Sequence, residues 1–446
     1  MTDSGAPQGE SRDKGSWLDR AFALSQNGTS VRTEFIGGAT TFLTMIYIVF
    51  VNPQILASAG MDHGAVFVAT CLAAAISTLI MALYANYPIA LAPGMGLNAF
   101  FAFTLVVGYK YTWQQALAFV FISGALAVVI TATRLREYVI NSIPHNLKLA
   151  VSAGIGLFLA IIALHGSGIV VADKATLVAL GDLTKWPAIL ALAGFVLIVV
   201  LNSRKVLGGT LIGIMAVTVV GIPLGIVDYA GVAALPPSLA PTFLQLDFSR
   251  VLEHTALIVI FSLVFVDLFD TAGTLIGVSH RAGFLDSAGN LPRMGRALVA
   301  DSSATVVGSL LGTSNTTSYI ESTSGVDAGA RTGLAGVFVA MFFLLALFLS
   351  PPAKMVPAYA TAAALLYVAC VMTRGLAEIA WDDITEYAPA VVTAIAMPLT
   401  YSIADGIGLG FITYALAKVL SGRFSEAHPA VLALAVLFAV KFAISG

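Results

Sequence analysis

Apolar runs separated by short polar connections fill the chain from about residue 35 to its end. Each run is close to the roughly 20 residues that a helix needs to cross the hydrocarbon core of a bilayer. The pattern therefore predicts an all-α polytopic membrane protein with fourteen spans. They are expected at 35–56, 65–86, 90–108, 113–133, 147–169, 187–202, 207–226, 256–279, 297–312, 313–330, 333–350, 356–377, 385–402 and 405–421. A further apolar stretch, 428–444, is expected to be a fifteenth span or a helix on the membrane surface.

Residues 1–31 differ from the rest, because they are polar and rich in glycine, serine and charge. This composition predicts a disordered cytoplasmic tail. We expect no signal peptide, since no short apolar core with a small-residue cleavage site follows.

The overall composition excludes an ordinary soluble enzyme. Hydrophobic residues make up 58% of the chain and charged residues only 10%, with a mean hydropathy of +0.93, whereas soluble domains carry about 25% charged residues. A net charge of −2 gives no reason to expect nucleic acid as a partner. Cys71 and Cys370 lie inside apolar runs and the six histidines are scattered, so we expect no disulfide, metal or other cofactor.

The basic residues indicate the orientation. With a cytoplasmic N-terminus and fourteen spans, most of the 22 Lys and Arg residues fall in cytoplasmic loops such as 134–146, 281–296 and 374–384. This agrees with the excess of positive charge on the inner side of membrane proteins. The expectation is a multi-pass protein of the cell (inner or plasma) membrane.

A faint repeat relates the two halves of the chain. Trp186-Pro-Ala-Ile-Leu is followed by Val206-Leu-Gly-Gly-Thr-Leu, and Tyr387-Ala-Pro-Ala-Val is followed at the same distance by Gly406-Ile-Gly-Leu-Gly-Phe. Each half would hold seven spans. An odd number of spans gives the halves opposite orientations, which predicts a 7+7 inverted repeat.

Two predicted spans are poor helices. Residues 87–101 contain the run Ala92-Pro-Gly-Met-Gly, and residues 312–325 are rich in Ser and Thr. Unwound backbone survives at membrane depth only where protein or a wet cavity satisfies its polar groups. Interrupted spans at matching positions indicate a transporter's substrate site. The alternative for 312–325 is an external loop.

The eighth span carries two carboxylates. Asp267, Asp270, Thr271 and Thr274 fall at i, i+3, i+4 and i+7, so they share one helix face. A carboxylate at the bilayer centre costs at least ~2.5 kcal/mol, which favours a functional role over helix packing satisfied by neighbouring Ser and Thr. Asp301 in the ninth span is expected to cap a helix or hold a half-helix in place.

Four motifs, at 93–101, 267–275, 312–322 and 397–407, carry a family resemblance. They resemble the AzgA-like branch of the nucleobase permeases, in the nucleobase cation (nucleobase:proton) symporter family, which carry hypoxanthine, adenine and guanine. The resemblance runs from about residue 34 to residue 423. It implies proton-coupled uptake of purine bases by a 7+7 inverted repeat with short strands in spans 3 and 10.

The resemblance also implies a division into two domains. The core domain would comprise 32–133 (spans 1–4) and 256–350 (spans 8–11). The gate domain would comprise 134–228 (spans 5–7) and 356–421 (spans 12–14). The stretch 428–444 has no place in this scheme. A homodimer is common in this architecture.

By motif, the substrate-contacting acidic position of span 10 falls on Glu321, and that of span 8 on Asp270, with Asp267 left open. The polar position of span 3 falls on Asn98. Gly96, Phe100 and Thr271 complete the candidate substrate-binding set. The candidates for carrying the proton are Asp267, Asp270 and Glu321.

These side chains suit a flat, neutral ligand edged with donors and acceptors. An ionised carboxylate accepts two adjacent N–H groups, and Asn98 can both donate and accept. Backbone N–H groups at half-helix starts can receive a carbonyl oxygen. Phe100 and Phe101 are candidates to cover the ring faces, with ordinary packing as the alternative. A proton-coupling carboxyl must gain and lose its proton as burial and ligand contacts change.

Other functions fit less well. An anion transporter of the same architecture should have an electropositive site, whereas three carboxylates occupy this one. An intramembrane aspartyl protease needs two Asp residues on different helices, whereas Asp267 and Asp270 share one. A channel is not favoured, because interrupted spans suit alternating access. A xanthine, urate or pyrimidine permease is the remaining alternative, and the preferred purine stays open.

Overall fold

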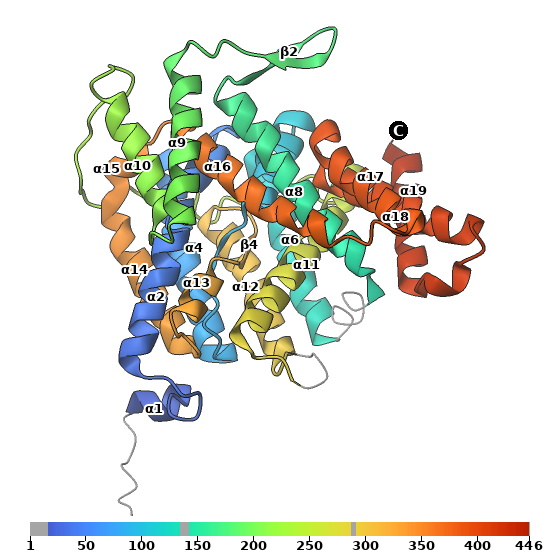
Figure 1. The fold of residues 1–446 in the computed structure, drawn as a ribbon, viewed down its shortest axis with the longest axis horizontal. Coiled ribbons are helices and arrows are strands. Elements are labelled where there is room, and N and C mark those ends of the chain that lie inside the picture. Colours follow the sequence, from blue (N-terminus) through green and yellow to red (C-terminus); the bar gives the residue numbers. More distant parts are fainter. Residues whose placement is uncertain (1–16, 134–141, 287–290, 446) are drawn as a thin grey trace, which may run out of the picture.

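The computed structural model describes residues 17–133, 142–286 and 291–445. The protein is mostly helical (Figure 1). Nine helices in the described residues are long and apolar enough to cross a membrane. They are Val31–Ala57, His63–Ala85, Trp113–Ala132, His145–Gly166, Trp186–Ser203, His254–Ala282, Gly333–Met355, Ala358–Glu378 and Ile403–Leu420. A multi-pass helical fold is thus confirmed, while fourteen spans remain a prediction.

The long helices begin and end within a few residues of predicted spans. The N-terminal half contains α1 (Trp17–Phe22), α2 (Val31–Met45), α3 (Ile48–Ala57), α4 (His63–Ile80), η1 (Met81–Ala85), β1 (Leu91–Pro93), α5 (Met95–Ala99), η2 (Phe100–Gly108), α6 (Trp113–Ala132), α8 (His145–Gly166), β2 (Val170–Asp173), β3 (Leu177–Leu180), α9 (Trp186–Ser203) and α10 (Gly209–Gly221). The C-terminal half contains α11 (His254–Ala282), α12 (Met294–Leu311), β4 (Thr316–Ser318), α13 (Ser322–Asp327), α14 (Gly333–Ala346), η3 (Leu347–Leu349), α15 (Ser350–Met355), α16 (Ala358–Thr373), η4 (Arg374–Glu378), α17 (Ile384–Thr400), α18 (Ile403–Leu420), η5 (Phe424–Glu426) and α19 (Pro429–Ser445).

Two short buried strands lie in the broken segments. β1 pairs with β4 in antiparallel register, with Leu91 opposite Ser318 and Pro93 opposite Thr316. β1 leads directly into α5, and β4 leads into α13. Proline and glycine prevent a continuous helix in this stretch, and the pairing satisfies backbone groups that would otherwise be unpaired in the interior.

Helix contacts correspond between the two halves. α14 packs on α2 and α4, and α6 packs on α11 and α12. Likewise α9 packs on α16, and α17 packs on α8. The motifs of the sequence repeat that begin at Trp186 and Tyr387 lie in α9 and α17, respectively.

A buried carboxylate joins α2 to the start of α14. Glu34 Oε1 accepts the backbone N–H of Arg331 at 2.9 Å, and Oε2 accepts that of Ala335 at 3.1 Å. Glu34 is fully buried. The carboxylate therefore supplies acceptors to N–H groups that a helix start leaves unpaired.

The structure corrects the prediction that 1–31 is a disordered tail. Residues 17–31 are folded: Phe22 and Leu24 are buried in a cluster with Leu334, and the Phe22 carbonyl accepts from Asn86 Nδ2 at 3.1 Å. Apolar side chains within the polar segment explain this packing. Residues 1–16 lie outside the described part.

An exposed hairpin follows the fifth predicted span, which ends at Gly166 rather than residue 169. β2 pairs with β3, and Asp173 Oδ1 accepts the N–H groups of Ala175 and Thr176 in the turn. Short polar side chains that bind the backbone two or three residues on favour such turns. The sequence thus contained a signal that the hydrophobic pattern missed.

The apolar stretch 428–444 lies almost entirely within α19, which packs against α18. The Phe438 ring lies 6.2 Å from that of Phe411 and 5.7 Å from that of Phe261 on α11. Lys441 Nζ lies 2.6 Å from Asp405 Oδ1. The stretch is therefore a helix held against the bundle by rings and an ion pair.

Candidate functional site

The candidate residues gather around the paired strands, where α5 and α13 begin. A methyl group built on Gly94, which precedes α5, would lie 3.5 Å from Asp270 Oδ2 and 2.9 Å from Thr317 Cγ2. Asp270, on α11, is half-buried. The absence of a side chain at Gly94 therefore lets the start of α5 approach both the Asp270 carboxylate and β4.

Glu321 lies between β4 and α13 and has a tyrosine partner. The Tyr47 hydroxyl donates to Glu321 Oε1 at 2.5 Å. A second tyrosine, Tyr319, donates its hydroxyl to the carbonyl of Pro93 at 2.5 Å and thereby joins the two broken segments. Sequence analysis missed Tyr47, because a tyrosine in an apolar run gives no signal of its distant partner.

Asn98 is fully buried on α5. Its Oδ1 accepts from the Ser314 hydroxyl, but among the described residues its Nδ2 has no hydrogen-bond partner. Within the same part of the chain, neither side-chain atom of buried Asn315 has a partner. An unpaired buried polar group costs about 1–3 kcal/mol. Both amides therefore have hydrogen-bonding capacity to offer a ligand or water, and Asn315 was not predicted.

Asp301, fully buried on α12, fastens β4 to its neighbours. Its Oδ2 accepts from the Thr271 hydroxyl at 2.5 Å, and its Oδ1 accepts the backbone N–H of Ser318 at 2.9 Å. This agrees with the expected role of holding the broken span in place. The Thr271 hydroxyl is committed to Asp301, so it would have to leave Asp301 to donate to a ligand.

Asp267 differs from Asp270 in its surroundings. Only 2% of Asp267 is exposed, one helical turn before the half-buried Asp270. Of the two carboxylates on α11, Asp270 is thus the more accessible.

Gly96 and the phenylalanines lie in tight packing. A methyl group built on Gly96 would lie 2.6 Å from Ile155 Cγ2, so the glycine permits α5 to approach α8. Phe100 and Phe101 are buried in the main hydrophobic core. In this structure, the two rings pack as core side chains.

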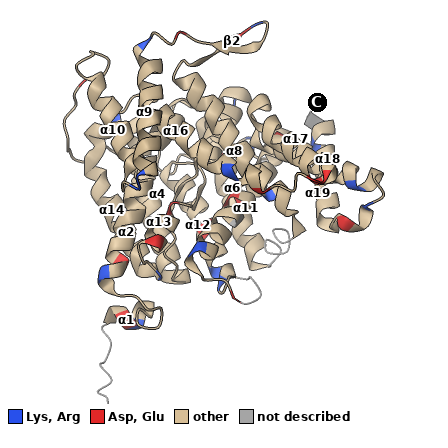
Figure 2. Ribbon diagram, in the orientation of Figure 1, with Lys and Arg blue, Asp and Glu red and all other residues tan. Residues whose placement is uncertain are grey.

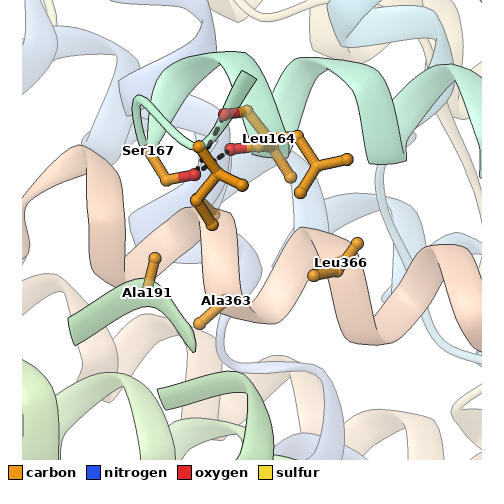
Figure 3. Close-up of a pocket in the computed structure, with 8 residues that line it drawn as sticks. Leu164, Ser167, Ala191, Ala363 and Leu366 are labelled. Atoms are coloured by element: carbon orange, nitrogen blue, oxygen red, sulfur yellow. Dashed lines mark hydrogen bonds between the residues drawn. The ribbon is translucent and has the colours of Figure 1, made fainter. Parts of the chain in front are cut away.

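A crevice elsewhere does not resemble a base-binding site. It lies among α8, α9 and α16, where Leu164, Ser167, Ala191, Ala363 and Leu366 border it (Figure 3). The Ser167 hydroxyl donates to the carbonyls of Ala163 and Leu164. The one hydroxyl of its lining is thus already engaged.

Charge follows the membrane pattern. Figure 2 shows Lys, Arg, Asp and Glu mainly in the loops and near helix ends. Asp270 differs from this pattern, because it lies within α11 and close to Gly94, which follows β1. Carboxylates at interrupted spans within a multi-pass helical bundle are typical of membrane transport proteins.

Comparison with known proteins identifies the family. The chain belongs to the Permease family, which matches residues 32–440. Adenine permease AdeP of Escherichia coli is 47% identical, over 95% of this chain and 95% of its own length. Guanine/hypoxanthine permease PbuG of Bacillus subtilis is 48% identical, over 94% of this chain and 98% of its own. These relatives are transporters, not enzymes.

A solved structure shares the fold. The transmembrane domain of the cyanobacterial bicarbonate transporter BicA matches with a TM-score of 0.63 and 17% identity, covering 85% of this chain and 97% of that domain. At this identity the likeness concerns the fold alone. It agrees with a helical, multi-pass membrane protein.

Proposed function

We propose that the protein imports purine nucleobases by proton symport. The observation that carries the proposal is the pairing of β1 with β4, which brings Asp270 and the starts of two half-helices together. Purine bases are supported as the ligand class by two relatives, an adenine permease, AdeP, and a guanine/hypoxanthine permease, PbuG.

The site chemistry suits a purine edge. Asp270 and Glu321 would accept N–H donors from the base, because ionised carboxylates are acceptors only. Asn98 Nδ2 would donate to a ring nitrogen or carbonyl oxygen. Gly96 would contribute its backbone to the site, and the Phe100 ring would contact the ligand only after leaving the core packing of this structure. Thr271 would act mainly through Asp301, which accepts its hydrogen bond.

The transport cycle would move a core domain against a gate domain. We assign spans 1–4 and 8–11 to the core and spans 5–7 and 12–14 to the gate, as a 7+7 inverted repeat. The corresponding helix contacts of the two halves support this layout. The close approach of Gly96 to Ile155 places a small residue between the two assigned domains, which suits an elevator-like sliding movement.

The carboxylates are the proton-carrying candidates. Asp270 and Glu321 come first among them, because Asp270 lies on α11 and Glu321 directly precedes α13, both beside the broken segments. Asp267 remains a third candidate. Uptake should rise as external pH falls and collapse with a protonophore. No effect of a pH gradient on accumulation in proteoliposomes would reject proton coupling and leave the carboxylates to binding.

The protein would lie in the cell membrane with its N-terminus in the cytoplasm, and a homodimer is the assembly we expect. After Cys71 and Cys370 are replaced, a cysteine introduced at exposed Arg293 should not react with a membrane-impermeant thiol reagent added outside intact cells. External labelling there would contradict the inverted repeat. Lys174, in the hairpin turn, is the matched site that should label from outside.

Uptake of radiolabelled bases tests the substrate directly. A strain lacking its own purine permeases should gain uptake of adenine, guanine or hypoxanthine on expressing the chain. Asp270→Asn should abolish most of it, whereas Glu378→Gln, at an exposed residue of η4, should not. The alternative permease classes would be favoured if xanthine, urate or uracil were taken up and adenine, guanine and hypoxanthine did not compete with them.

A further inference from the structure

An apolar groove runs along the outside of α4, η1 and α12. It is a shallow, open hollow of about 480 Å³, lined by Ile76, Leu79, Ile80, Leu83, Tyr84 and Val299. The first five recur at helical spacing and so form one face. Leu83 is 66% exposed and Tyr84 is 50% exposed. In a membrane protein such a face contacts lipid chains.

Two exposed arginines lie at the start of α12, the helix that supplies Val299 to this groove. The Arg296 guanidinium carbon lies 5.8 Å from the centre of the Tyr84 ring. The Arg293 guanidinium carbon lies 4.6 Å from the centre of the Tyr87 ring. Aromatic faces attract and orient such cations. Among the described residues, no carboxylate forms an ion pair with either guanidinium.

The arrangement has the polarity of a phospholipid. Arg296 precedes Val299 by three residues, so it stands about one turn nearer the start of α12. From Tyr84 to Ile76 the groove extends about 12 Å along the helix, at 1.5 Å per residue. Positive charge therefore lies at one end and an uninterrupted apolar path leads away from it.

We propose that this groove binds an anionic phospholipid, with its phosphate at Arg293 and Arg296 and an acyl chain along α4. Basic pockets between membrane helices recognise anionic head groups. A zwitterionic lipid would bind less well, because its ammonium group would face two guanidinium groups that have no carboxylate partner within the described part of the chain. The apolar lining selects a lipid over a free phosphate ion.

Lipid retention tests the proposal. The full chain is reconstituted with phosphatidylglycerol and phosphatidylcholine, transferred to mild detergent, and its retained lipid is measured by mass spectrometry. The wild type should retain phosphatidylglycerol preferentially. Arg293→Gln with Arg296→Gln should weaken its binding about 30-fold, because each arginine contributes about 1 kcal/mol and about 1.4 kcal/mol corresponds to a tenfold change.

Arg204→Gln with Lys205→Gln is the matched control, because it removes two exposed positive charges elsewhere. Equal retention of both lipids by the wild type would overturn the proposal. So would unchanged selectivity in the double arginine variant, provided that this variant still takes up base and is therefore folded.

Ile76→Trp separates a lipid from a free anion. It should obstruct the acyl path and reduce phosphatidylglycerol retention while both arginines remain, and inorganic phosphate should not displace the lipid. Normal retention in Ile76→Trp, or displacement by inorganic phosphate, would overturn the assignment. Disulfide crosslinking of Leu83→Cys between two copies, with Cys71 and Cys370 replaced, would assign the face to a second copy instead.

Discussion

The Tyr47 hydroxyl donates a hydrogen bond to Glu321 Oε1 over 2.5 Å, although 274 residues separate the two in sequence. Tyr47 lies just before α3 and is almost fully buried. Its hydroxyl occupies one acceptor of the carboxylate that we assign to the base. The tyrosine thus fixes the carboxylate's orientation and leaves fewer acceptor positions for the ligand.

Tyr47→Phe should weaken base affinity about tenfold. The substitution keeps the ring but removes one hydrogen bond to a charged group, worth roughly 1.5–3 kcal/mol. The measurement is the inhibition constant for guanine in uptake, normalised to surface protein. Tyr229→Phe, at an exposed tyrosine, is the control. An unchanged constant in Tyr47→Phe would mean that the orientation of Glu321 does not depend on Tyr47.

Asp301→Asn should act on stability instead of selectivity. The amide nitrogen cannot accept from Ser318 N–H or Thr271, and leaving a buried donor unsatisfied costs about 1–3 kcal/mol. We expect a lower Tm in detergent and less protein in the membrane, with unchanged ratios between the constants for adenine, guanine and hypoxanthine. Asp228→Asn is the exposed control. A selective loss of one base would instead place Asp301 in contact with substrate.

The sequence predicted the helices and the broken segments better than the contacts between them. Helix positions follow from runs of apolar residues, and the breaks near Pro93 and Gly312 follow from local backbone preferences. The Tyr47–Glu321 bond depends on segments far apart in the chain. So does the buried Asn315 amide, which has no partner where the structure describes the chain. No local pattern encodes such a contact, so both were missed.

Two carboxylates outside the membrane spans should make the stability of the fold depend on pH. A hydrogen bond from Thr385, together with Arg423, lowers the pKa of Asp383 to about 2. Hydrogen bonds from Arg423 and Lys418 lower the pKa of Glu426 to about 2. Both pKa values lie below the ordinary ones, 3.8 for Asp383 and 4.5 for Glu426. The two ionised carboxylates therefore stabilise the fold above about pH 5, and this contribution is lost as pH falls toward 2.

Arg423→Gln should therefore lower Tm at pH 7 and flatten the fall in Tm between pH 5 and pH 3. Arg423 Nη1 lies 2.6 Å from Asp383 Oδ2, and its Nη2 lies 2.7 Å from Glu426 Oε2. Thermal unfolding in detergent across this range is the measurement. Arg374→Gln, at an exposed arginine, should show the same fall in Tm with pH as the wild type. Parallel curves for Arg423→Gln would show that these ion pairs do not set acid stability.

Glu321→Gln tests the base-binding role most sharply. The variant keeps the size of the side chain but replaces one acceptor oxygen with a donor amide. Losing a hydrogen bond to a charged group corresponds to about a 10- to 150-fold loss of affinity. Guanine should lose most, because its two adjacent donors need both carboxylate oxygens. Adenine should lose less, since its exocyclic amine stands beside a ring acceptor.

The pattern across bases separates binding from structure. Inhibition constants for guanine, hypoxanthine and adenine are compared in wild type and Glu321→Gln, normalised to surface protein, with Glu378→Gln as the exposed control. A structural role would reduce membrane abundance and affect every base equally. Unchanged constants for all three would remove Glu321 from the site. Base recognition would then rest on Asp270 and Asn98, with residues 312–322 serving as the scaffold that positions β4.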